Sequence, residues 1–157
     1  MSSPFVLLLA FLIGFFSGLR ALTPATMTAW AAQIEWLRLP RALAWFGTMP
    51  AAIIFTVLAL AELVNDKNPK AGNRTAPPAL TARIVTGGFS GACVAAAGAQ
   101  GMLIGALIGA AGAIAGTFGG YQARAKLVKA LGVPDFIVAV AEDLVTICGS
   151  LWVVSRF

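Results

Sequence analysis

Long apolar runs separated by short polar segments dominate the chain. Residues 84–121 contain no charged residue, and this run is about twice as long as one helix needs to cross ~30 Å of hydrocarbon. It therefore predicts two helices, at residues 82–98 and 102–121, with a Gly-Ala-Gln-Gly turn at residues 98–101 between them. Three other apolar runs predict helices at residues 5–22, 43–64 and 136–154.

The first apolar run is followed by the signal for a broken helix. Thr23 and Pro24 are typical of a helix start, with threonine as the N-cap and proline at the first helical position. Residues 24–36 are too short to cross a membrane and carry two tryptophans, so they are expected to form an interfacial or re-entrant half-helix. Pro50 lacks a backbone N–H and is expected to kink the 43–64 helix or delay its start.

The composition is that of an integral membrane protein. Hydrophobic residues make up 59% of the chain and charged residues 11%, with a mean hydropathy of +0.88, whereas about a quarter of the residues in a soluble domain are charged. We therefore expect a single transmembrane domain over residues 1–157, an all-α bundle of about five spans. The net charge of +5 is spread over short loops, which argues against nucleic acid as a partner.

The charged residues between the spans predict an orientation. The loops after the second and fourth spans are basic, and a five-span order places both on one side, which the positive-inside rule makes cytoplasmic. The tryptophans then gather toward the outer interface, as an aromatic belt would. The basic residues are Lys67, Lys70, Arg74 and Arg83 in one loop and Arg124, Lys126 and Lys129 in the other, and the tryptophans are Trp30, Trp36, Trp45 and Trp152.

Two short segments occur twice in similar form. LIGFFSGLRAL at residues 12–22 is similar to IAGTFGGYQAR at 114–124, and LALAELV at 58–64 is similar to VAVAEDLV at 138–145. In a five-span order the matching helices run in opposite directions, so the pattern predicts an inverted repeat that relates helices 1 and 2 to helices 4 and 5. Chance similarity between segments rich in small residues is the alternative.

Glycines at four-residue spacing predict close contacts between helices. This spacing places them on one face of a helix, a glycine zipper that lets neighbouring backbones approach. The same faces also offer contacts for a homo-oligomer such as a dimer. The predicted packing glycines are Gly14, Gly18, Gly105, Gly109, Gly112, Gly116 and Gly120.

A few polar side chains lie within or beside the apolar runs. On insertion scales a charged residue costs ~2.5–3.5 kcal/mol at the centre of a membrane helix, so such residues are expected to be paired or hydrated and to mark a binding site. The alternative for Arg20 and Glu62 is that their side chains reach the interface and serve no site. The predicted substrate- or ion-binding residues are Arg20, Glu62, Gln122, Glu142 and Asp143.

Three motifs give a family resemblance. GLRALTP at residues 18–24, AELVNDKNP at 61–69 and AEDLV at 141–145 resemble an uncharacterised family of small bacterial inner-membrane proteins that is catalogued as a domain of unknown function. The resemblance covers nearly the whole chain. It implies a multi-pass protein of the bacterial inner (plasma) membrane and brings no activity.

Two functions from different classes fit these features. The first is a small transporter or channel that moves a small solute or ion through a site lined by carboxylates, which suit proton or cation coupling, although Arg20 favours an anion. The second is a non-transporting oligomeric scaffold, with glycine faces for assembly and basic loops for anionic lipid. An enzyme is not expected, because the chain has no histidine and no nucleophile with an evident base. No cofactor and no metal are expected.

Overall fold

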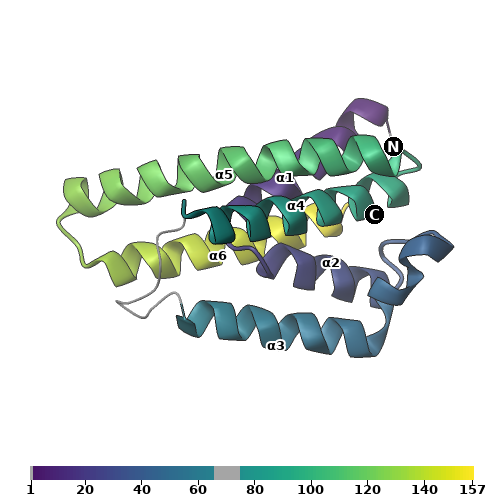
Figure 1. The fold of residues 1–157 in the computed structure, drawn as a ribbon, viewed down its shortest axis with the longest axis horizontal. Coiled ribbons are helices and arrows are strands. Elements are labelled where there is room, and N and C mark those ends of the chain that lie inside the picture. The colour runs from purple at the N-terminus through teal and green to yellow at the C-terminus, as the bar shows by residue number, and fades with distance from the viewer. Residues whose placement is uncertain (1, 66–74) are drawn as a thin grey trace.

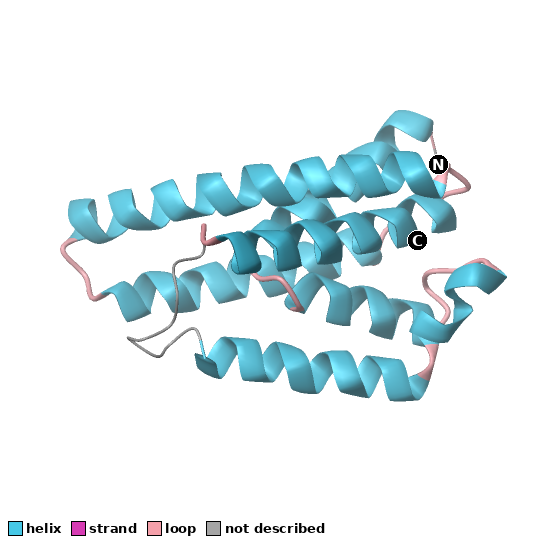
Figure 2. Ribbon diagram, viewed as in Figure 1, coloured by secondary structure: helices cyan, strands magenta, loops and turns pink. Residues whose placement is uncertain are grey.

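The structure is a computed structural model that describes residues 2–65 and 75–157. Within these ranges the chain is all-α and contains no strand (Figures 1 and 2). The elements are α1 (Ser3–Leu19), α2 (Thr23–Gln33), the 3-10 helix η1 (Arg41–Gly47), α3 (Met49–Asn65), α4 (Pro77–Ala97), α5 (Met102–Leu131) and α6 (Asp135–Val154).

The first two helices form a hairpin inside the bundle. α1 leads from the end that holds both termini toward the middle, and α2 leads back toward the same end (Figure 1). Arg20 ends α1 because its backbone is extended, with φ −139° and ψ 117°. The predicted break and the restart at Thr23 are therefore confirmed, and α1, with 17 residues, is only ~25 Å long.

Helix lengths suggest a membrane protein. Within the described residues, α4, α5 and α6 are each long and apolar enough to cross a membrane. η1 and α3 reach that length only together, and they are bent by 59° at the break between them. This bend lies just before Pro50, as predicted. Five spans were expected. The first of them, predicted at residues 5–22, corresponds to α1, which is shorter than the helices that can cross a membrane.

The fifth helix is longer than predicted. The segment after Tyr121 that carries Arg124, Lys126 and Lys129 was expected to be a loop, but α5 continues through it to Leu131, so the predicted loop is wrong. The segment is rich in alanine, lysine, arginine and leucine, which are strong helix formers. Gly132, with φ 61°, ends the helix in the left-handed conformation that glycine adopts at no steric cost.

The predicted inverted repeat is wrong, because α1 and α5 run in the same direction. Gly14 faces Gly109, and Gly18, one turn later on α1, faces Ala113 and Thr117 one to two turns later on α5. An inverted repeat needs these two helices to be antiparallel. The physical reason for the difference is α2, which reverses the chain once more than a five-span order does (Figure 1).

The predicted packing glycines lie at close approaches between α1, α4 and α5. A Cβ atom added at Gly14 would overlap the carbonyl group of Gly109, and one added at Gly116 would overlap that of Phe15. These contacts fill the glycine faces within one chain. The other close approaches are Gly18 to Ala113, Gly105 to Gly91, Gly109 to Gly87, Gly112 to Phe11 and Gly120 to Leu19.

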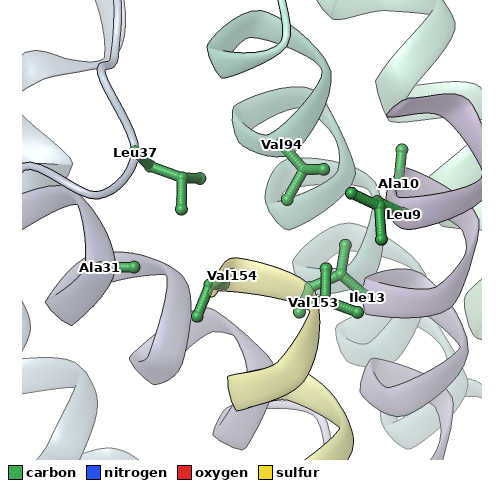
Figure 3. Packing of buried hydrophobic residues seen from close by; sticks show 8 residues of the cluster. All are labelled: Leu9, Ala10, Ile13, Ala31, Leu37, Val94, Val153 and Val154. Carbon is green, nitrogen blue, oxygen red and sulfur yellow. The ribbon is translucent and has the colours of Figure 1, made fainter. Parts of the chain in front are cut away.

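An apolar cluster closes the bundle toward the end that holds the termini. Side chains from α1, α4 and α6 meet there with residues from α2 and the segment after it (Figure 3). None of them is more than 1% exposed, so this part of the bundle excludes water. We call this cluster the apolar plug: Leu9, Ala10, Ile13, Ala31, Leu37, Val94, Val153 and Val154.

The contact between α1 and α5 predicts unequal effects for two glycines of the same helix. Gly116→Ala should destabilise the fold by ~1–3 kcal/mol, because the added methyl group meets the backbone of Phe15 and the core must shift. Gly119→Ala, where no neighbouring atom lies within 4 Å, should leave stability unchanged or raise it slightly. Thermal unfolding followed by circular dichroism in detergent measures both, and equal midpoints would contradict this packing.

Candidate functional site

The break between α1 and α2 leaves backbone N–H and C=O groups that cannot form hydrogen bonds within either helix. At the end of α1, the Gly18 carbonyl oxygen accepts hydrogen bonds from Arg83 Nη1 at 3.0 Å and from Thr117 Oγ1 at 3.2 Å. These donors come from α4 and α5. Arginine is favourable at this position because the C-terminal end of a helix carries partial negative charge.

At the other side of the break, Glu62 of α3 binds the backbone before α2. The N–H of Ala21 donates to Glu62 Oε1 at 2.8 Å, and the N–H of Leu22 donates to Oε2 at 2.9 Å. A carboxylate is favourable there because the N-terminal end of a helix carries partial positive charge. The expected cap by the Thr23 side chain is wrong, since α2 has Leu22 as its N-cap residue and no side-chain cap.

Arg20 lies in the break and pairs with α6. Its Nε is 2.6 Å from Asp143 Oδ1, and the two side chains are 1% and 12% exposed. The alternative that Arg20 reaches the interface is therefore wrong. Since a buried charge without a counter-charge costs several kcal/mol, this ion pair allows the break to lie inside the bundle.

The acid beside Asp143 faces a different cation. Glu142 Oε2 lies 3.5 Å from Nη1 of Arg124 on α5, and Arg124 also pairs with Asp135 at the start of α6. Adjacent positions of a helix point in different directions, so these two acids face different cations. The side chain of Asp135 is 62% exposed. The chain of contacts from Glu142 through Arg124 to Asp135 therefore ends at the surface.

These residues form one group, which we call the charged cluster. The sequence predicted four of its members, but Gln122 lies on an exposed part of α5 and is not among them. Arg83 and Arg124 were missed because both were counted with the basic residues that set the orientation at the ends of the spans. The two prolines that start α4 were the available signal, since they place Arg83 about two turns inside a helix. The cluster consists of Arg20, Arg83, Arg124, Glu62, Glu142, Asp143 and Thr117.

The fold and the charged cluster define an all-α protein with apolar helices of membrane-crossing length and charged groups at a helix break. The chain belongs to the family described as Domain of unknown function (DUF4126), which matches residues 7–155. The family resemblance of its motifs is thereby confirmed. Comparisons with curated proteins and with solved structures found no match.

The ion pair between Arg20 and Asp143 predicts a large loss of stability when the Asp143 carboxylate is replaced by an amide. Asp143→Asn should lower the free energy of unfolding by ~3–5 kcal/mol, because it replaces the carboxylate 2.6 Å from the buried Arg20 guanidinium by a neutral amide. The double variant Arg20→Met, Asp143→Leu should be more stable than Asp143→Asn. Asp135→Asn, at an exposed pair, should change stability by less than ~1 kcal/mol.

Chemical denaturation in detergent measures all three variants. If Asp143→Asn proved as mild as Asp135→Asn, the buried ion pair would not stabilise the fold as described.

Proposed function

We propose that this protein is a small transporter or channel of the bacterial inner membrane that moves a small solute or ion through the charged cluster. The observation that carries the proposal is the break at residues 20–22, where Glu62 binds two backbone N–H groups at 2.8 and 2.9 Å. Inside a membrane, irregular backbone is tolerated only where protein buries it or where it lines a water-filled cavity. Broken helices of this kind form the binding sites of many transporters.

The proposed placement in the membrane follows from the ends of the helices. α4, α5, α6 and the bent pair of η1 and α3 cross the bilayer, while the α1–α2 hairpin enters and returns on one side. Arg124, Lys126 and Lys129 lie at the opposite end of the bundle, near the end of α5 (Figure 1). By the positive-inside rule this basic end is cytoplasmic. Lys67, Lys70 and Arg74, which were expected to add to it, lie outside the described residues.

In this placement the described conformation is closed toward the outside. The apolar plug lies between the outer end and the break, and an apolar constriction can close a pathway by excluding water. Arg124 and Asp135, with side chains 17% and 62% exposed, lie toward the cytoplasmic end. The charged cluster is therefore nearer to water on the cytoplasmic side.

The packing weakens the case for a scaffold. That alternative relied on glycine faces available for assembly, but the close approaches at these glycines are made within one chain, between α1, α4 and α5. These glycines are therefore occupied within the chain, and transport is the function we propose.

Flux through reconstituted protein tests the proposal. Vesicles loaded with potassium chloride are assayed with a chloride electrode, with radioactive rubidium and with an entrapped pH dye. Glu62→Gln should reduce the flux roughly tenfold, because an amide cannot accept both backbone N–H groups, and a hydrogen bond to a charged group is worth ~1.5–3 kcal/mol. Glu35→Gln, at an exposed acid, is the matched control and should retain the wild-type flux.

Two results would contradict the proposal. One is wild-type vesicles that conduct no more than protein-free vesicles under any of the three readouts. The other is equal flux through Glu62→Gln and wild type, which would remove this carboxylate from the mechanism.

A further inference from the structure

Four buried hydroxyl groups have no hydrogen-bond partner within the described part of the chain. Each comes from a different helix, and each residue is at most 5% exposed. Hydroxyl groups in apolar helices usually donate to the carbonyl four residues earlier, as Thr28 and Thr146 do here. A buried polar group that gives up this bond needs an explanation such as a ligand. The four hydroxyl groups belong to Ser17, Thr23, Ser90 and Ser150.

The three serines lie at nearly the same level of the bundle. A Cβ atom at Gly87 would lie 3.2 Å from Ser17 Cβ, and Ser90 follows Gly87 by one turn on α4. On α6, Gly149 faces the ring of Phe16, so the next residue, Ser150, is also within about one turn of Ser17.

This level separates the apolar plug from the break. Val94 follows Ser90 by one turn on α4, and Val153 follows Ser150 on α6, so both valines extend into the plug. In the other direction, Ser17 precedes Arg20 by three residues. The serines therefore lie at the level between the apolar plug and the helix break.

The break itself already holds an anionic group. The Glu62 carboxylate is bound by the N–H groups of Ala21 and Leu22, and Arg20 is the neighbouring cation. Thr23, the first residue of α2, adds a buried hydroxyl group without a partner at the same helix end. Apart from the Glu62 carboxylate, which accepts, these groups are donors, and they lie at the positive end of a helix.

A cation would be disfavoured at this position. It would meet the Arg20 guanidinium and the positive end of α2, while Glu62 is engaged by backbone N–H groups and Asp143 by Arg20. An anion would instead meet hydroxyl and N–H donors together with a guanidinium, the set that helix N-termini present to anionic ligands.

We propose that the transported substrate is a small monovalent anion that takes the place of the Glu62 carboxylate at the N-terminus of α2. The hydroxyl groups of Thr23 and of the three serines donate hydrogen bonds to the anion at the break and directly beside it. This inference rests on the proposed transport function and specifies the substrate class for the same site.

Anion binding to purified protein tests the inference separately from transport. Chloride and nitrate are titrated by calorimetry into protein in detergent and gluconate buffer, with rubidium gluconate as the cation control. Glu62→Gln should bind chloride roughly tenfold more tightly than wild type, because the competing carboxylate is gone. A merely structural role for Glu62 predicts weaker or unchanged binding.

The hydroxyl groups supply the second set of variants. Thr23→Val and the triple change Ser17→Ala, Ser90→Ala, Ser150→Ala should each weaken chloride binding several-fold, since each removes donors to the anion. Thr81→Val, which removes an exposed hydroxyl group that binds its own helix, is the matched control and should bind chloride as wild type does.

The outcomes distinguish this inference from the proposed function. Saturable anion binding that tightens in Glu62→Gln supports the inference even if the vesicles show no flux, in which case the transport proposal fails alone. Absence of saturable chloride and nitrate binding overturns the inference. Glu62-dependent rubidium flux without anion binding also overturns it and leaves transport standing.

Discussion

The structure depends on hydrogen bonds that other helices supply to a broken helix. Between α1 and α2 the backbone N–H and C=O groups have no hydrogen-bond partners within the two helices. Each such group left without a partner in apolar surroundings costs several kcal/mol. Arg83 and Thr117 bind the carbonyl side of the break, and the Glu62 carboxylate binds the N–H side. Each charge has the sign that the adjoining helix end favours. Three neighbouring helices thus hold the break in place.

Close packing brings these partners within reach. The glycines of α5 let α1 approach at backbone distance, which leaves Arg20 at the level of Asp143 on α6. The apolar plug covers the same helices toward the end that holds the termini, so it separates the charged groups from that end of the bundle. In the proposed transport function, this arrangement provides a site closed on one side. The charges that stabilise the fold are then also the groups that a substrate meets.

The sequence predicted most elements of the fold, because apolar runs, prolines and the Gly-Ala-Gln-Gly turn are local signals. It also predicted Arg20, Glu62, Glu142 and Asp143 as candidate binding residues, and these are the four that the structure brings into the charged cluster. Their pairing could not be predicted, since it depends on the direction of each helix, and the half-helix α2 changes that direction. Counting α1 as a full span produced the inverted repeat, and treating residues 122–131 as a loop concealed Arg124. For Glu62, only the tertiary contacts show that the carboxylate binds the N–H groups before α2 rather than reaching the membrane interface.

The central claim is that α1 and α2 form a hairpin whose two ends lie on one side of the membrane. Single cysteines introduced as Ser3→Cys, Arg38→Cys and Lys129→Cys, with Cys93 and Cys148 replaced by alanine, test it by labelling with a membrane-impermeant maleimide in spheroplasts. The account predicts that positions 3 and 38 react before lysis and position 129 only after lysis. Labelling of position 3 only after lysis, together with position 129, would show that α1 crosses the membrane and would contradict the account.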